Sequence, residues 1–129
     1  MWTLMKQVRP GMDLSKVVLP TFILEPRSFL EKLADYYNHS HLLVDTVRLA
    51  DPYHRMREVV KFYLSGFFKK PKGLKKPYNP ILGECFRCYW QHPGQQDGKT
   101  FYIAEQESHH PPVSAFYVSN REGGYNVSG

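Results

Sequence analysis

Residues 105–115 read Glu-Gln-Glu-Ser-His-His-Pro-Pro-Val-Ser-Ala, the most unusual run in the chain. Pro111 and Pro112 each fix φ at about −65° and hold their neighbours in extended backbone. The preceding pair, His109 and His110, is therefore presented from a stiff segment. Two imidazoles supply N–H donors and become cationic near neutral pH, so the pair suits a phosphate monoester. The alternative is two structural histidines at a strand edge.

The sequence on both sides of this run has the period of β-strands. Residues 100–105 and 113–119 are expected to be strands, and residues 121–124 form a turn before another strand at 125–128. Upstream, Phe86, Cys88 and Trp90 alternate with more polar neighbours. The pattern predicts antiparallel strands over residues 84–129.

The first half of the chain has helical spacing instead. Pro26 is expected to open a first helix, whose apolar face holds Phe29, Leu30, Leu33, Tyr36 and Tyr37. Ser40 is expected to cap a second helix over 41–49, and Asp51 with Pro52 a third that begins there. Gly66 is expected to end the third helix in a left-handed conformation. Helices followed by strands indicate the α+β class.

A basic segment joins the two halves. Residues 69–83 are expected to form a loop without regular structure, because Lys69, Lys70, Lys72, Lys75 and Lys76 surround Pro71 and Gly73. Within it, two prolines bracket Asn79, which offers both a donor and an acceptor. Lys76 is a mobile charge suited to phosphate. For Lys69, Lys70 and Lys72 plain solvation is the favoured interpretation, and the alternative is attraction to anionic lipid, worth about 1 kcal/mol per residue.

The composition indicates one globular domain with an anionic partner. Of 129 residues, 42% are hydrophobic and 22% charged, and the net charge is +5. Aromatic residues make up 15%, which favours a large apolar interior or a groove lined with rings. The lysines cluster in one loop and do not interleave with exposed rings, so no nucleic acid is expected. No apolar run reaches the roughly 18 residues that span a bilayer, so we expect a soluble chain with peripheral membrane contact.

Neither a metal, a cofactor nor enzymatic activity is expected. Cys85 and Cys88 have C-x-x-C spacing but lack the further ligands of a zinc site, so we interpret them as ordinary strand residues. Ser108 and His109 are neighbours in the chain, and neighbouring residues in strand-like backbone point to opposite faces, which rules them out as nucleophile and base. Paired carboxylates with the spacing of an acid–base site are absent from the sequence as well.

The two motifs resemble the signatures of the oxysterol-binding-protein-related family. Residues 105–112 look like the family's fingerprint, and residues 75–84 are similar to its second signature. Residues 19–28 resemble the branch that carries phosphatidylserine. Glu107 departs from the pattern, where a small or apolar residue is expected. Its charge weakens a phosphate site nearby unless the side chain points away.

The resemblance implies an incomplete β-barrel around an apolar lipid tunnel. Residues 1–20 would form a lid, 26–68 a helical segment, 69–83 the basic signature loop and 84–129 the first barrel strands. His109, His110 and Lys76 would bind the phosphate of phosphatidylinositol 4-phosphate. Asn79 and the backbone around Val17 and Leu19 would contact lipid headgroups, and the lid would include Trp2, Met5, Val8 and Leu14.

The function that the resemblance implies is lipid exchange between membranes. Phosphatidylinositol 4-phosphate would move one way, and phosphatidylserine or sterol the other, at the cytosolic face of contacts between the endoplasmic reticulum and the plasma membrane. The family's domain is longer than this chain, so we expect the chain alone to fold poorly and to transfer little lipid. The alternative is a peripheral module that binds anionic membranes without extracting lipid.

Overall fold

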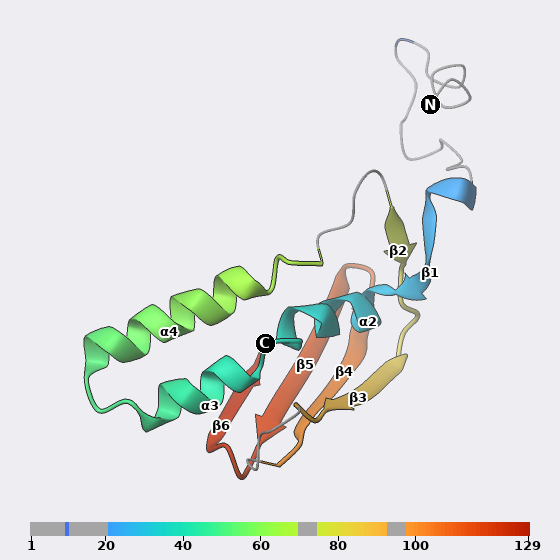
Figure 1. Cartoon of the computed structure of the whole chain (residues 1–129). Coiled ribbons are helices and arrows are strands. Elements are labelled where there is room, and N and C mark those ends of the chain that lie inside the picture. The colour runs from blue at the N-terminus through green and yellow to red at the C-terminus, as the bar shows by residue number, and fades with distance from the viewer. Residues whose placement is uncertain (1–9, 11–20, 70–74, 93–97) are drawn as a thin grey trace.

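The computed structural model describes residues 10, 21–69, 75–92 and 98–129 (Figure 1). The expected lid residues Trp2, Met5, Val8 and Leu14, and also Val17 and Leu19, lie outside this range. In chain order the elements are η2 (Thr21–Ile23), β1 (Leu24–Ser28), α2 (Phe29–Ala34), η3 (Asp35–Tyr37), α3 (His41–Arg48), α4 (Pro52–Ser65), β2 (Lys76–Tyr78), β3 (Cys85–Trp90), β4 (Thr100–His109), β5 (Pro112–Asn120) and β6 (Tyr125–Ser128). The predicted α+β class is confirmed.

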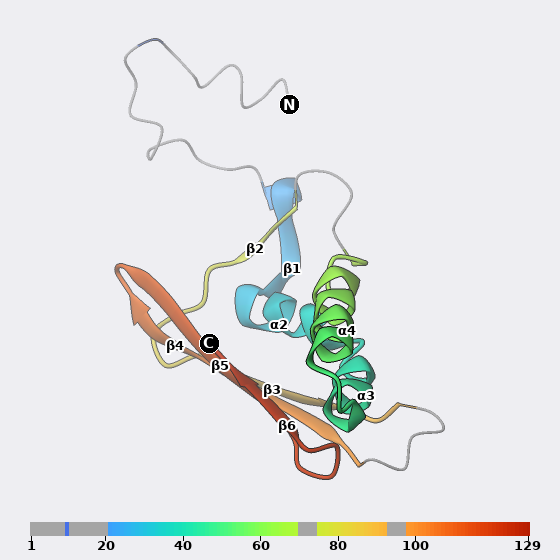
Figure 2. The same ribbon diagram turned by 90° about the vertical axis from the view of Figure 1, so that its left-hand side faces the viewer.

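The main sheet is an antiparallel meander in the order β3-β4-β5-β6. Its strands agree with the predicted period, although β4 runs four residues further than expected, to His109. Along β4 buried and exposed residues alternate from Thr100 to Glu107, which shows that only one face is covered. Figure 2 shows α2, α3 and α4 on one side of this sheet. The other face carries exposed aromatic side chains, including Tyr89, Phe101 and Tyr117.

The core lies between α2, η3 and the covered face of the sheet. Its buried members are Leu30, Ala34, Tyr37, Tyr102, Ala104 and Val118. Tyr102 stacks on Phe116 with ring centroids 6.3 Å apart, and its hydroxyl donates to the Leu30 carbonyl at 3.1 Å. Burial raises the pKa of Tyr37 to about 12 and that of Tyr102 further still. Each large apolar side chain buried here contributes roughly 1.5–3 kcal/mol, so these contacts fix α2 on the sheet.

The first helix begins later than the sequence predicts. Pro26 lies in strand β1, and α2 starts at Phe29 with the Ser28 hydroxyl as its N-cap, accepting from Leu30 N. Strand β1 pairs in parallel with β2, Leu24 opposite Lys76. Pro26 lacks the donor that a central strand needs, and it is tolerated because β1 belongs to a two-stranded sheet with an open edge. The expected helical segment from residue 26 was therefore wrong at its start.

The expectation of an irregular loop over residues 69–83 was also wrong in part. Lys76–Tyr78 form strand β2, since the backbone of β1 offers a partner that the local composition does not reveal. Residues 70–74 lie outside the described range. Lys75 precedes the strand and donates to the Phe22 carbonyl at 3.0 Å. Lys76 therefore lies in a short strand, and Asn79 follows directly after it.

Two of the three expected caps differ from the prediction. Asp51 caps α4 through His54 N, as expected, with Pro52 in the first turn. Ser40 adopts helical backbone and makes no cap bond, because its hydroxyl contacts His92 instead at 3.0 Å. Gly66 has φ −64° and is not left-handed. A Cβ there would lie 2.7 Å from a ring carbon of Tyr36, so close packing explains the glycine.

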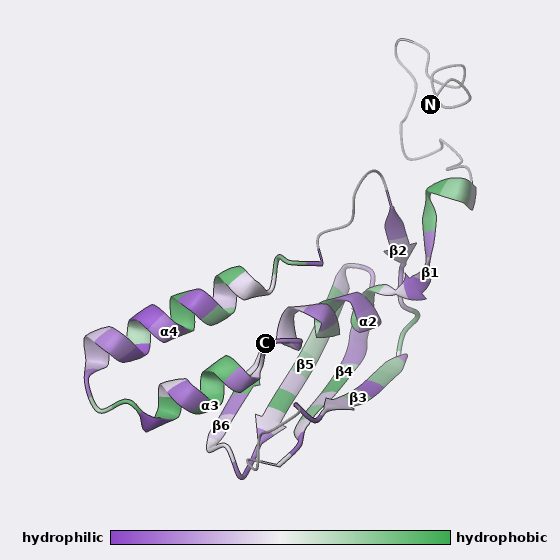
Figure 3. Ribbon diagram, in the orientation of Figure 1, coloured by the Kyte–Doolittle hydropathy of each residue, from purple (hydrophilic) through white to green (hydrophobic). Residues whose placement is uncertain are grey.

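Helix α4 has an apolar face that the described chain does not bury. Tyr53, Met56 and Leu64 keep 73%, 62% and 62% of their surface exposed. Figure 3 shows hydrophobic segments recurring along α4 between hydrophilic ones. The helix contacts the rest through α3 and through Phe62, whose ring lies 5.9 Å from that of Tyr37. Among the described helices, none combines the length and the apolar character required to cross a bilayer.

Three histidines gather at the sheet end opposite the turn between β4 and β5. The rings of His39 and His41 lie 5.9 Å apart, and those of His41 and His92 lie 4.8 Å apart. Burial, followed by the charges of the neighbouring histidines, lowers the pKa of His41 and of His92. His41 and His92 therefore bind protons less readily in the folded state than in the unfolded chain.

Acidification is expected to destabilise the fold through this cluster. Because the pKa values are depressed in the folded state, the full stability is present above the ordinary value of about 6.5 and is lost as pH falls below it. Urea unfolding at about pH 7.5 and about pH 5.5 is expected to differ by on the order of 1 kcal/mol. The double variant His41→Gln and His92→Gln should flatten this difference, whereas His54→Gln, outside the cluster, should not. An unchanged pH dependence in the double variant would contradict the account.

Candidate functional site

The two histidines of the fingerprint lie side by side at the tip of β4. Their ring centroids are 4.6 Å apart, with the planes at 76°. His109 is half-buried, and His110 is exposed in the turn. Nδ1 of His109 lies 2.9 Å from the Pro80 carbonyl. Because a carbonyl only accepts, Nδ1 carries the proton, and Nε2 is the ring nitrogen left for a ligand.

The second signature is joined directly to the fingerprint. Gly83 N donates to the Gln106 carbonyl at 2.9 Å, and Gln106 N donates to the Glu84 carbonyl at 3.0 Å. Gly83 has φ +75°, a left-handed conformation that favours glycine and allows this turn. Together with the contact between His109 and Pro80, these bonds bring the two predicted motifs into one site.

Glu84 ties the same loop to the start of α2. Its carboxylate accepts from the Ser28 hydroxyl at 2.5 Å and from Ile81 N at 3.1 Å. Ser28 also caps α2, so a single hydroxyl links the helix, the loop and strand β3. Sequence reasoning did not single out these roles. The only signal was that Glu84 closes the second signature.

An apolar pocket of about 460 Å³ lies beside this junction. Its lining residues are Phe29, Leu33, Asn79, Gln106, Pro112, Ser114 and Phe116. Asn79 therefore lies where it was expected, at the site. Lys76 is exposed on β2, and within the described chain no hydrogen bond or ion pair joins it to either histidine. Because the lining combines apolar rings with polar side chains, the pocket suits an amphiphilic ligand.

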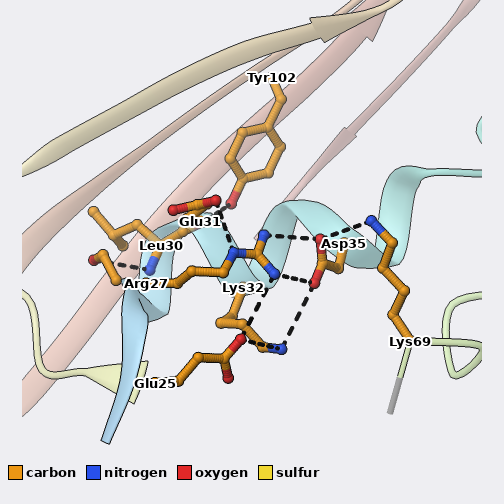
Figure 4. Close-up of polar contacts among 9 residues, drawn as sticks. Glu25, Arg27, Leu30, Glu31, Lys32, Asp35, Lys69 and Tyr102 are labelled. Atoms are coloured by element: carbon orange, nitrogen blue, oxygen red, sulfur yellow. Dashed lines mark hydrogen bonds and ion pairs between the residues drawn. The ribbon is translucent and has the colours of Figure 1, made fainter. Parts of the chain in front are cut away.

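A network of charged side chains holds β1 against α2 (Figure 4). Arg27 donates to both carboxylate oxygens of Asp35, at 2.8 and 3.0 Å, and to Glu31 at 2.7 Å. Lys32 and Lys69 approach Asp35 at 3.7 and 3.6 Å. Burial tends to raise the pKa of Asp35, but the hydrogen bond and charge of Arg27, with the two lysines, bring that pKa below its ordinary value. The network fixes β1, and through β1 the strand that carries Lys76.

Glu107 points away from the pocket. It is exposed, whereas Gln106 beside it is buried and lines the pocket. The departure from the family pattern therefore does not place a carboxylate in the lining of the pocket.

The two cysteines are free thiols on strand β3. Burial, with the charges of Glu31 and Asp35, raises the pKa of Cys88 to about 11, which makes its thiolate scarce. Cys85 is exposed. Across the described ranges, no group of three or more His, Cys, Asp or Glu side chains is placed to hold a metal ion.

A mainly apolar pocket that also carries the amides of Asn79 and Gln106 is typical of a site for a small molecule. Over residues 1–129 the chain matches the family model described as oxysterol-binding protein. It is 72% identical over 128 residues to oxysterol-binding protein-related protein 8 of Homo sapiens, and 70% identical over 129 residues to oxysterol-binding protein-related protein 5 of the same species. The chain belongs to the oxysterol-binding protein family.

Solved structures of relatives agree with the fold. The Osh1 ORD domain in complex with ergosterol matches with a TM-score of 0.74 and 31% identity over 93% of this chain. The Osh3 ORD of Saccharomyces cerevisiae in complex with PI(4)P matches with a TM-score of 0.67 and 31% identity over 92%. The chain spans 27% and 30% of these chains. The matches to the two human relatives include 99% and 100% of this chain, but only 14% and 15% of the length of those relatives.

Proposed function

We propose that this chain is part of a lipid-transfer domain that exchanges phosphatidylinositol 4-phosphate for phosphatidylserine or sterol. The observation that carries the proposal is the junction of the two signatures, where His109 contacts Pro80 next to the Asn79 pocket. Family members bound to ergosterol and to PI(4)P support lipids of both kinds as ligands.

In this proposal the site separates the two ends of a lipid. Nε2 of His109 and the ring of His110 face the phosphate as charge-assisted donors when protonated. The Asn79 amide and Lys76 take further headgroup oxygens. The apolar lining, with Phe29, holds the start of the lipid's hydrocarbon chains. Residues 1–20, with Val17 and Leu19, keep their expected roles as headgroup cover and lid.

The mechanism is a binding equilibrium without a chemical step. One site admits one lipid at a time, so loading of one ligand requires release of the other. A gradient of phosphatidylinositol 4-phosphate then drives the counter-flow. We propose that this activity occurs at the cytosolic face of membrane contact sites, with peripheral attachment to anionic surfaces through exposed lysines such as Lys75.

Extraction from vesicles tests the proposal. An extended protein, in which this chain is continued to the full length of the family's domain, is expected to remove phosphatidylinositol 4-phosphate from vesicles. The competing function, a module that only attaches to anionic membranes, predicts co-sedimentation with the vesicles and no soluble lipid complex. Soluble complex is thus the result that separates the two.

The 129-residue chain alone is expected to extract little lipid and to expose apolar surface. The exposed faces of α4 and of the sheet leave large side chains such as Tyr53, Met56 and Phe101 in water. We expect strong binding of a fluorescent apolar dye and extraction at least about tenfold below that of the extended protein, a difference of roughly 1.4 kcal/mol or more. Efficient transfer by the purified short chain would refute this expectation.

A further inference from the structure

Strands β4 and β5 lose their regular pairing inside the fingerprint. Gln106 pairs with Ser114, the next pair is Ser108 with Val113, and His109 pairs with Pro112. Glu107 therefore has no partner on β5 and is an extra residue on β4. An unpaired extra residue in an antiparallel ladder is a β-bulge, a feature that re-aims the side chains beyond it.

The bulge reverses the alternation of faces. Tyr102, Ala104 and Gln106 point to the covered face, so a regular strand would turn His109 to the opposite face, with Phe101 and Ile103. With Glu107 inserted, His109 shares the face of its partner Pro112, which lines the pocket with Ser114. The contact of His109 with the Pro80 carbonyl agrees with this placement. One extra residue thus decides on which side of the sheet the histidine lies.

The side chain of Gln106 bridges the bulge with two hydrogen bonds, which we call the clip. It is buried, with 1% of its surface exposed. Its Nε2 donates to the Ser108 carbonyl at 2.8 Å, on the far side of Glu107. Its Oε1 accepts from the Ser114 hydroxyl on β5. The clip satisfies a carbonyl next to the extra residue and holds it to the neighbouring strand.

We propose that Gln106 and Ser114 are positioning residues, which hold the bulge at Glu107 and thereby turn His109 toward the lipid phosphate. This inference rests on the proposed function only in that the ligand of His109 is a lipid phosphate. It also explains how a charged residue is accommodated at position 107, because Glu107 is the bulged residue and its side chain is exposed.

Without the clip, a regular register competes with the bulge. In that register Glu107 pairs with Val113 and Ser108 with Pro112, and His109 moves into the turn and away from Pro80. Deleting Glu107 removes the competition, since a regular ladder of the shorter strand again places His109 opposite Pro112. A loss of lipid extraction caused by removal of the clip should therefore be reversed by deletion of Glu107.

The test combines these two changes in the extended protein. Gln106→Ala is expected to weaken extraction of phosphatidylinositol 4-phosphate by roughly tenfold, the value of about one buried hydrogen bond. Ser114→Ala, a milder change, should act in the same direction. Deletion of Glu107 in the Gln106→Ala background should restore extraction to within about threefold of the parent, which is less than 1 kcal/mol. Glu107→Ala in that background keeps the strand length and should restore nothing.

A second measurement follows His109 without any lipid. Nitrogen-15 NMR of labelled histidine is expected to show His109 protonated at Nδ1 in the parent, to lose that signature in Gln106→Ala, and to regain it when Glu107 is also deleted. If the deletion of Glu107 restores neither extraction nor the NMR signature, or only one of them, Gln106 is only a packing residue and the proposal is wrong. If NMR follows the prediction while His109→Ala extracts normally, the bulge inference stands and the proposed phosphate site fails.

Discussion

Replacing His109 and His110 with alanine in the extended protein is expected to abolish extraction of phosphatidylinositol 4-phosphate. Hydrogen bonds to a charged group are worth about 1.5–3 kcal/mol each, so loss of two corresponds to a decrease of roughly 100-fold or more. Extraction of phosphatidylserine or sterol should change by less than about threefold, because the imidazoles bind the 4-phosphate, which these lipids lack, and the apolar pocket remains. Vesicle extraction of each lipid by parent and variant measures the effect.

A matched control uses a histidine outside the site. His54 is an exposed histidine on α4, and His54→Ala should leave extraction of every lipid unchanged. The unfolding midpoint of the histidine double variant should stay near that of the parent, since His110 is exposed and His109 makes one described hydrogen bond. Equal extraction by parent and double variant would show that the pair is structural.

Replacing Arg27 with methionine is expected to lower the free energy of unfolding by about 2–3 kcal/mol. Removal of one partner from a buried ion pair costs about 3–5 kcal/mol, and the 28% exposure of the Arg27 side chain reduces that effect. Asp35 would remain buried and lose its bidentate donor. Because the pKa of Asp35 is depressed in the folded state, this stabilisation is present above the unfolded value of about 3.9 and is lost as pH falls below it. Urea unfolding of both proteins, near neutral pH and near pH 3, measures both effects.

Arg57→Met is the matched control for the ion pair. Arg57 approaches Glu58 at 3.6 Å but keeps 62% of its side chain exposed. A surface pair of this kind contributes about 0–1 kcal/mol, so the control should barely move the midpoint. The combined variant Arg27→Met and Asp35→Leu should recover part of the loss, since it leaves no unpaired buried carboxylate. Equal effects of Arg27→Met and Arg57→Met would contradict the role given to the network.

Local patterns were sufficient for much of the fold. The strands from Cys85 onward were predicted by period-two alternation and turn residues, which depend on neighbours in sequence. The cap at Asp51 was predicted for the same reason. The β1–β2 pair was not, because its partners lie about fifty residues apart and Pro26 fits a helix start as well as an edge strand. Propensity at Pro26 was overridden by this distant pairing.

Only part of the candidate site could be predicted from the sequence, for the same reason. The motifs around His109 and Asn79 were visible in the sequence, and their union at Pro80 agrees with the family resemblance. The roles of Glu84 and Gln106 were not visible. Their contacts depend on the register between strands and on a single extra residue, which composition and spacing do not encode. The network at Arg27 depends likewise on how β1 packs against α2.

The measurement that tests the central claim most directly is coupled transfer between two vesicle populations. Donor vesicles would carry phosphatidylserine, and acceptor vesicles would be prepared with and without phosphatidylinositol 4-phosphate. If one site holds either lipid in turn, the extended protein should move phosphatidylserine several-fold faster toward acceptors that contain phosphatidylinositol 4-phosphate, and His109→Ala with His110→Ala should remove that acceleration. A phosphatidylserine transfer rate that does not depend on phosphatidylinositol 4-phosphate, while sterol transfer is equally independent of it, would contradict exchange through this site.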